Sequence, residues 1–203
     1  MPQFSGKDPM QPEFWNQRFE AQFTPWDKGG VPLALQEFVS QAQQPLVTLI
    51  PGCGIGYEAA FLAQAGWDVT AIDFSPAAVA SARAAIGVWG RHIVEADFFL
   101  HQPAQPLGLI YERAFLCALP PAMRPEIAKR WAELLPAGAL LAGFFFLDES
   151  AERSLKGPPF SITGVQLEAL LLPYFELQED VAVSDSIAVF AGKERWQVWR
   201  RRA

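Results

Sequence analysis

Three glycines at alternate positions follow a short apolar run, and they are the clearest chemical feature of the sequence. Gly52, Gly54 and Gly56 come directly after the run 46–50. Because glycine has no side chain, a bound molecule can approach the backbone closely at such a turn. The pattern alone also fits an ordinary tight turn between a strand and a helix.

Two carboxylates occupy matching positions after the next two apolar runs. Asp73 ends the second run, twenty-one residues after Gly52, and Asp97 with Phe98 ends the third. A carboxylate at the first position can accept hydrogen bonds from both hydroxyls of a ribose. The acid and ring at the second position suit an adenine base and its exocyclic amine. Each acid taken singly also fits a helix start or a loop, but together they describe a nucleoside-shaped pocket.

The residue after the third glycine separates two classes of adenosine-containing cofactor. In the dinucleotide pattern G-x-G-x-x-G, the last position needs a small residue because the helix packs closely on the strand and the pyrophosphate binds its first turn. The chain has Tyr57 at that position. This favours S-adenosylmethionine, which has no phosphate, and leaves a nicotinamide-dependent oxidoreductase as the alternative enzyme.

These residues are expected at strand ends in a repeated pattern of strands and helices. From position 46 onward, short apolar runs alternate with helical segments, which is typical of a largely parallel sheet. Strands are expected over residues 46–50, 67–72, 91–95, 107–115, 139–147, 175–183 and 196–200. Helices are expected over residues 57–65, 76–86, 124–135 and 165–172, with Ser75 as an N-cap and a capping box from Thr163 to Gln166. The sequence therefore predicts a Rossmann-like α/β fold with a seven-stranded, mostly parallel, doubly wound sheet, and the longest apolar run, 139–147, is expected at its centre.

Length and charge limit the number of domains and the class of partner. The 203 residues, of which 51% are hydrophobic, fit a single domain with its own core. Residues 1–45 precede the first strand and are expected to form an N-terminal helical cap. The formal net charge of -6 argues against a nucleic-acid partner, because binding phosphates requires clustered Lys and Arg. The basic run 200–202 is expected to be a solvated chain end.

The spacing of cysteines and histidines bears on metal binding, and the length of apolar segments bears on membrane insertion and export. Cys53 and Cys117 lack a second Cys or His at metal-site spacing and are expected to be small buried side chains. His92 and His101 also lack such partners and are expected at the surface. No stretch approaches the length of a membrane span, and the first twenty residues contain no apolar leader. No metal, no membrane and a cytoplasmic location are therefore expected, for a monomer or weak homodimer.

Several motifs make the chain similar to the thiopurine S-methyltransferase family, and the branch that it resembles most is that of the plant thiol and halide methyltransferases. The resemblance covers most of the chain. It rests on Phe14-Trp15 with Phe19, and on the segments 24–29 (TPWDKG), 51–54 (PGCG), 73–76 (DFSP), 97–99 (DFF), 115–121 (FLCALPP) and 157–160 (GPPF).

The resemblance implies a class I methyltransferase fold with S-adenosylmethionine as methyl donor and S-adenosylhomocysteine as its product. It implies that rings from the cap close over the donor and that residues at the strand ends line its pocket. These residues are Trp15, Phe19, Trp26, Gly52, Cys53, Gly54, Asp73, Phe74, Asp97, Phe98 and Arg113. Taken without the resemblance, Trp15 and Phe19, four residues apart, also fit an ordinary packing face of a helix.

The acceptor implied by the resemblance is a small soft nucleophile, in the first place a thiol. A thiol has a pKa of about 8.5, so a few per cent is thiolate at neutral pH and needs little help from a base. Arg113 would orient the acceptor; arginine here is typical of the thiopurine branch, whereas the plant branch often has tyrosine. Halides, sulfide, selenium or tellurium species and heteroaromatic thiols stay open as acceptors. The alternative to an enzyme is a protein that binds S-adenosylmethionine without catalysing a reaction.

Two positions depart from common patterns. Many methyltransferases have an acid two residues before the first glycine of the turn, where this chain has Ile50. The ammonium group of the donor then needs other partners, such as backbone carbonyls. Phe19 stands where tryptophan is frequent, which keeps the ring but loses its N–H donor.

Overall fold

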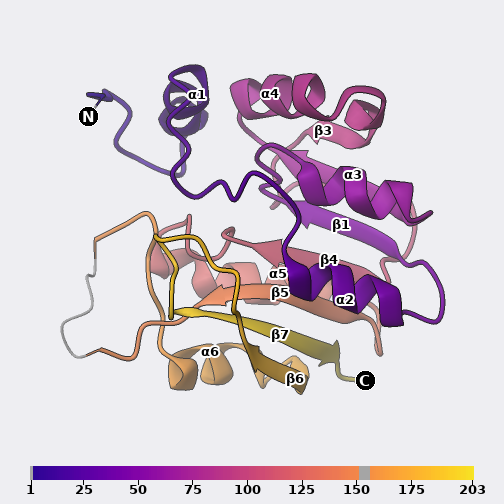
Figure 1. Ribbon diagram of the computed structural model, residues 1–203. Helices are drawn as coiled ribbons and strands as arrows, with labels where there is room; N and C mark the ends of the chain where they lie inside the picture. Colours follow the sequence, from indigo (N-terminus) through magenta and orange to yellow (C-terminus); the bar gives the residue numbers. More distant parts are fainter. Residues whose placement is uncertain (1, 151–155) are drawn as a thin grey trace.

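The computed structural model describes residues 2–150 and 156–203, which form an α/β sheet with helices on both faces (Figure 1). The strands are β1 (Val47–Pro51), β2 (Asp68–Asp73), β3 (Ile93–Glu95), β4 (Leu109–Arg113), β5 (Leu140–Phe146), β6 (Phe175–Ala182) and β7 (Glu194–Arg201). The α-helices are α1 (Pro12–Glu20), α2 (Leu33–Gln41), α3 (Tyr57–Gln64), α4 (Pro76–Ile86), α5 (Arg124–Leu134) and α6 (Gly164–Leu171). Two short 3-10 helices, η1 (Gly87–His92) and η2 (Pro121–Met123), complete the elements.

The sheet has the strand order β3-β2-β1-β4-β5-β7-β6. The first five of these strands pair in parallel, and β7 is antiparallel to both β5 and β6. The predicted fold class is confirmed. The carboxyl ends of the parallel strands all lie at one end of the sheet, on the left of Figure 1.

Most strand limits differ from the prediction by one or two residues, and one strand has a different position in the sheet. β3 begins at Ile93 because residues 87–92 form a 3-10 helix. β4 ends at Arg113 because Ala114 has a left-handed φ of 57° and the chain leaves the sheet there. The prediction that β5 is the central strand is wrong, since β4 holds the middle position. A continuous apolar run indicates burial on both faces, which every interior strand of such a sheet shares.

Two apolar clusters, one on each face of the sheet, hold the helices in place. In β5, Leu141 and Phe145 belong to the cluster that contains residues of α5 and α6. Ala142 and Phe144 of the same strand belong to the other cluster, which contains residues of α2, α3 and α4. The alternation follows from the two-residue period of a strand. It makes the sheet doubly wound.

Local capping fixes where the helices begin. The Ala78 N–H donates to Ser75 Oγ at 3.1 Å, and Pro76 takes the first helical position of α4. The capping box before α6 is also confirmed: Gln166 N–H donates to Thr163 Oγ1 at 3.2 Å, and Thr163 N–H donates to Gln166 Oε1 at 3.1 Å. α4 therefore starts three residues beyond Asp73, which ends β2.

The N-terminal segment has two parts with different surroundings. α2 packs on the sheet, where Leu35 is fully buried in the core. α1 packs against α4 instead (Figure 1). The two helices are thus held by different elements, although the sequence places both in one predicted cap.

Arg200 and Arg202 of the basic chain end are exposed to solvent, as expected, and Arg201 and Arg202 also bind backbone carbonyls. Arg201 Nε donates to the Ala132 carbonyl at 3.0 Å, and Arg202 Nε donates to the Phe175 carbonyl at 2.8 Å. Cations near the end of a helix can bind carbonyls that lack a partner within it. Separately, a helix with the length and hydropathy of a membrane span is not found in the part of the chain that the structure describes.

Candidate active site

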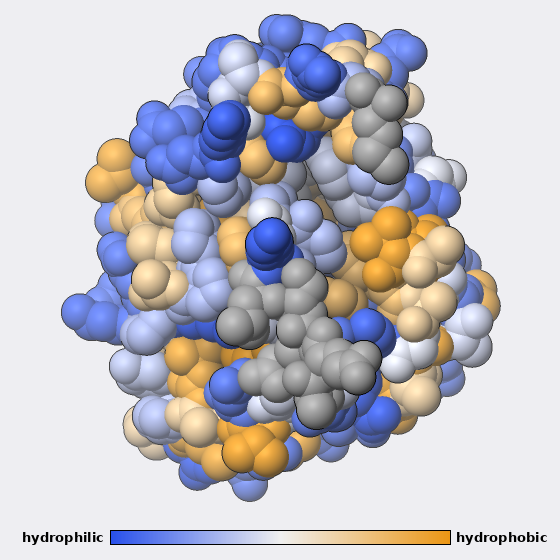
Figure 2. All heavy atoms as spheres, turned by 90° about the vertical axis from the view of Figure 1, so that its left-hand side faces the viewer, coloured by the Kyte–Doolittle hydropathy of each residue, from blue (hydrophilic) through white to orange (hydrophobic). Residues whose placement is uncertain are grey.

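A cavity of about 410 Å³ opens at the carboxyl ends of β1, β2 and β4. Figure 2 looks onto this end of the sheet, where hydrophobic and hydrophilic side chains are interspersed. In open parallel sheets this end is where ligands bind. All the residues predicted from sequence line the cavity, namely Trp15, Phe19, Trp26, Gly52, Cys53, Gly54, Asp73, Phe74, Asp97, Phe98 and Arg113.

The glycine turn after β1 forms the floor of the cavity. Gly52 and Gly54 have φ values of 61° and 53°, in the left-handed region that favours glycine. A Cβ on Gly52 would lie 2.8 Å from the ring of Phe115, so this position also has no room for a side chain. The turn is fixed to β2 because Cys53 N–H donates to the Ile72 carbonyl at 3.1 Å.

Asp73, at the end of β2, presents a buried carboxylate beside this turn. Its Oδ1 accepts from Ser75 N–H at 3.0 Å and its Oδ2 from Gly54 N–H at 3.3 Å. Burial raises the pKa of Asp73 to about 6, although the backbone donors oppose the rise. Each oxygen keeps a lone pair for another donor, so the carboxylate can receive two hydroxyls of a ribose.

The acid and ring after β3 have different surroundings. Phe98 is buried, with its ring centroid 5.0 Å from that of Phe115 in an edge-to-face arrangement. Asp97 is exposed, and its Oδ1 accepts from Phe99 N–H at 2.8 Å. The pair thus gives the cavity an apolar wall with a carboxylate at its rim.

Aromatic rings from α1 and the following loop form another wall. The ring centroid of Trp26 lies 5.6 Å from that of Trp15 and 6.1 Å from that of Phe19, both edge to face. Trp15 Nε1 donates to the Pro9 carbonyl at 2.9 Å. Phe19 is buried and also lines the cavity, so this face of α1 both packs on the protein and forms part of the cavity wall.

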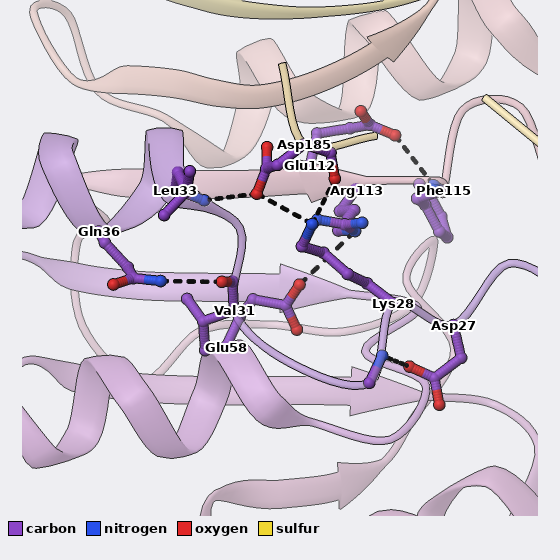
Figure 3. A network of polar contacts seen from close by, with 11 residues as sticks. Asp27, Lys28, Val31, Leu33, Gln36, Glu58, Glu112, Arg113, Phe115 and Asp185 are labelled. Atoms are coloured by element: carbon purple, nitrogen blue, oxygen red, sulfur yellow. Dashed lines mark hydrogen bonds and ion pairs between the residues drawn. The ribbon is translucent and has the colours of Figure 1, made fainter. Parts of the chain in front are cut away.

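A buried ion pair lies at the end of β4, and one of its partners was not found by sequence reasoning. Arg113 Nε is 3.6 Å from Glu58 Oε1, and both side chains are about 12% exposed (Figure 3). Burial raises the pKa of Glu58, and the charge of Arg113 lowers it in part. Among residues 2–150 and 156–203, the buried Arg113 Nη1 has no partner within hydrogen-bonding geometry, although the Tyr111 hydroxyl interacts with the Arg113 side chain. Arg113 lines the cavity, so Nη1 can donate to a molecule bound there. The available signal for Glu58 was an acid in the first turn of a helix, which is common at exposed helix starts.

Glu112 is a second buried acid that sequence reasoning missed. Its Oε1 accepts from the N–H groups of Phe115 and Leu116, each at 2.9 Å (Figure 3 shows the first). Burial raises the pKa of Glu112 to about 7. Its carboxyl group holds the tight turn after β4, which places Arg113 and Phe115 on the cavity.

An ion pair connects two loops beside the cavity. Lys28, in the loop after α1, lies 2.9 Å from Asp185 Oδ2 and also donates to the Asp185 carbonyl, and Leu33 N–H donates to Asp185 Oδ2 at 3.0 Å (Figure 3). Lys28 and Phe190, which belong to the two loops, both line the cavity. Asp185 is 157 positions from Lys28, so no local pattern could have indicated the contact.

The two cysteines line the cavity as buried thiols. Burial raises the pKa of Cys53 and of Cys117 well above the usual value, and neighbouring carboxylates raise both further. Both thiols are buried, as expected. A protonated thiol is a poor nucleophile, so the structure gives neither cysteine a covalent role. His92 and His101 lie partly exposed at the surface, each with a buried Nε2.

The family model described as "Thiopurine S-methyltransferase (TPMT)" matches residues 10–202. The chain belongs to the thiopurine S-methyltransferase family. Membership makes it an S-adenosylmethionine-dependent methyltransferase and decides against the nicotinamide-dependent oxidoreductase. The family match includes the segment from α1 onward, so the N-terminal rings are part of the matched region.

Relatives within this family come from plants and bacteria. The chain is 30% identical over 194 residues to a protein of Arabidopsis thaliana named "Probable thiol methyltransferase 2", covering 92% of this chain and 84% of the relative. It is 29% identical to thiocyanate methyltransferase 1 of the same plant, with the same coverage. It is 30% identical to a thiopurine S-methyltransferase of Shewanella piezotolerans, covering 83% of this chain and 85% of the relative.

Solved structures that resemble this family member are methyltransferases at low sequence identity, and they bear on the fold. A 1,6-didemethyltoxoflavin-N1-methyltransferase of Burkholderia thailandensis has a TM-score of 0.76 at 16% identity, covering 100% of this chain and 94% of that one. A magnesium protoporphyrin IX methyltransferase of Synechocystis has a TM-score of 0.69 at 15% identity, covering 98% of this chain and 100% of that one. The class I methyltransferase fold is therefore shared.

Proposed function

We propose that this methyltransferase transfers the methyl group of S-adenosylmethionine to a small thiol in the cavity at the carboxyl ends of β1, β2 and β4. The observation that carries the proposal is the buried Asp73 carboxylate beside a glycine turn, in a cavity whose lining also includes many aromatic rings. The names of the plant relatives, which mention thiol and thiocyanate, support a soft nucleophile as acceptor.

The residues of the cavity fit the donor at its adenosine end. Asp73 would accept hydrogen bonds from the ribose hydroxyls, with Gly52, Cys53 and Gly54 as the backbone cradle and Phe74 beside them. Asp97 and Phe98 would bind the adenine. Trp15, Phe19 and Trp26 would cover the donor from the cap.

The chemistry needs little from the protein beyond binding and orientation. When bound, S-adenosylmethionine supplies a methyl group already activated by its positively charged sulfur. The aromatic wall excludes water from the cavity, and a desolvated site favours a reaction in which opposite charges are neutralised. Arg113 Nη1, for which the described part of the chain offers no hydrogen-bond partner, would donate to the acceptor and favour its anionic form.

We also propose a cytoplasmic monomer or weak homodimer that uses no metal and binds neither nucleic acid nor membranes. The net charge of -6 supports the exclusion of nucleic acid. In residues 2–150 and 156–203 no three His, Cys, Asp or Glu side chains are grouped as metal ligands. Size-exclusion chromatography with light scattering over a range of concentrations tests the oligomeric state, and a stable higher oligomer would contradict it.

Methyl-labelled S-adenosylmethionine tests the activity. The protein is incubated with this donor and a panel of an aliphatic thiol, a heteroaromatic thiol, hydrosulfide, thiocyanate, iodide and selenite, and volatile and non-volatile products are analysed. We expect S-methylated products to form fastest. Halide methylation exceeding thiol methylation would overturn the choice of acceptor. Binding of S-adenosylhomocysteine with no transfer to any acceptor would instead favour a catalytically silent binding protein.

A further inference from the structure

Asn16 lies in the middle of α1, next to Trp15, and connects this helix to the start of α4. Its Oδ1 accepts from Ser75 Oγ at 2.7 Å and from Ala77 N–H at 3.2 Å. Both partners are about 60 residues away in the chain, as the separations of 59 and 61 show. The contact is thus a tertiary link between the cap helix and the sheet domain, made by one side-chain oxygen.

The same hydrogen-bond chain continues from Ser75 to the carboxylate of Asp73. Ser75 N–H donates to Asp73 Oδ1 at 3.0 Å, and Gly54 N–H donates to Asp73 Oδ2 at 3.3 Å. Ser75 is fully buried, and its hydroxyl accepts from Ala78 N–H while it donates to Asn16. Four segments therefore share one network, from α1 through Ser75 and Asp73 to the glycine turn.

We infer that Asn16 is a positioning residue for the methyl donor, which holds α1 and its aromatic rings against the segment that presents Asp73. The inference rests on the proposed binding of the donor at Asp73. Moving α1 away would leave the buried Ser75 hydroxyl without its acceptor and Ala77 N–H without a partner, and buried polar groups without partners are costly. The position of α1 and the orientation of the Asp73 carboxylate, which would bind the ribose, are therefore coupled through Asn16.

The role of Asn16 depends on its oxygen acceptor, and this gives a selective set of variants. In N16A the acceptor is lost. In N16D it is kept, and a carboxylate is also favourable at the start of α4 because the helix dipole is positive there. Gln17→Ala is the matched control, since Gln17 lies on the same helix and its bonds go to Ser5, Gly6 and Glu13 within the N-terminal segment.

Calorimetric titration with S-adenosylhomocysteine, together with amide hydrogen exchange over residues 12–20, tests the inference. We expect N16A to raise Kd about tenfold. This is the effect of losing one neutral hydrogen bond and leaving its buried partner unsatisfied. We expect N16D and Q17A to bind within about twofold of the natural protein. Added S-adenosylhomocysteine should slow exchange in α1 of the natural protein and of N16D, but not of N16A.

A double-mutant cycle with Ser75→Ala separates this role from general destabilisation. If Asn16 acts through Ser75, adding N16A to S75A raises Kd by much less than N16A does alone. Natural Kd values for N16A, equal losses in N16A and N16D, or additive effects in the cycle would each overturn the inference. Failure of the natural protein to bind S-adenosylhomocysteine would overturn the proposed function and this inference with it.

Discussion

Asp73 is ionised at a cost, because burial raises the pKa of its carboxyl group to about 6. A group whose folded pKa lies above its unfolded value stabilises the fold at low pH, and this contribution is lost as pH rises through the folded pKa. Before the donor binds, the ionised form therefore destabilises the protein above pH 6 or so. The position of Asp73 thus suits hydrogen bonding to a ligand and lowers the stability of the unliganded protein.

Cofactor affinity should consequently depend on pH. As pH falls through about 6, Asp73 takes up a proton and can accept fewer hydrogen bonds, so Kd for S-adenosylhomocysteine should rise. In Asp73→Asn, Kd at pH 7.5 should rise by about tenfold to a hundredfold and change little between pH 5 and 7. Calorimetry over this pH range measures both. An affinity of the natural protein that does not change with pH would remove Asp73 from the binding site.

Arg113 should affect turnover more than folding. Arg113→Met keeps an apolar stem but removes the charged guanidinium that lies over the Phe144 ring, so kcat/KM for a thiol should fall about tenfold or more. Arg195→Met is the control, because this arginine is in an ion pair with Asp180 on the antiparallel strands, away from the cavity. Steady-state kinetics and circular dichroism give the result. Unchanged kinetics with every active acceptor would exclude Arg113 from the site.

The sequence predicts the residues that follow strands, but not those that complete their surroundings. Asp73 and Asp97 could be found because strand ends of a parallel sheet meet at one place. Glu58 could not, since it lies in the first turn of α3 and its partner Arg113 comes from β4, far along the chain. Asn16 and Asp185 were missed for the same reason, because their partners are distant in the chain.

At the scale of elements, the pair Lys28 and Asp185 joins the loop after α1 to the segment between β6 and β7. The pair joins two loops and no helix or strand of the sheet, so its loss should free these loops locally and change global stability little. Asp185→Ala should instead speed amide exchange over residues 24–33 and raise Kd for S-adenosylhomocysteine a few fold, with little change in Tm.

Asp180→Ala is the matched control for this loop contact, because it breaks an ion pair of similar type within the β6 and β7 pair. Its exchange over residues 24–33 should equal that of the natural protein. Equal exchange in both variants would show that the contact does not hold the loop.

The cap of α6 has a different consequence, since this helix packs on the face of the sheet opposite α2 and Thr163 does not line the cavity. Thr163→Ala removes the hydroxyl of the capping box, so the free energy of unfolding should fall by about 1 kcal/mol and Tm by roughly 2–4 °C. Thermal unfolding measures the change. Kd for S-adenosylhomocysteine should stay the same, and a large change in Kd would contradict the separation between this helix and the site.

Helix starts were predicted well because their signals are local, whereas strand positions were not. The N-caps Ser75 and Thr163 act within four residues of themselves. The position of β5 in the sheet depends on which strands pair with it, and the apolar run 139–147 does not indicate these partners. The early end of β4 follows from Ala114, whose left-handed φ belongs to a turn held by Glu112.

At the scale of the whole molecule, the arrangement of the sheet explains why the site lies where it does. The parallel strands place the glycine turn, Asp73 and Arg113 at one end, and the reversal of strand order between β1 and β4 opens a crevice there. α1 and its loop then supply the aromatic wall. The alternation of strands and helices predicted this sheet from sequence, but the division of the N-terminal segment between the cavity and the core required the structure.

The central claim is that this cavity holds the methyl donor with its ribose on Asp73 and beneath the rings of Trp15 and Trp26. A crystal structure of the protein with S-adenosylhomocysteine tests it most directly. Both ribose hydroxyls should lie about 3 Å from the Asp73 oxygens, with the adenine beside Phe98 and the sulfur facing Arg113. A ligand bound elsewhere, or with its ribose away from Asp73, would contradict the claim.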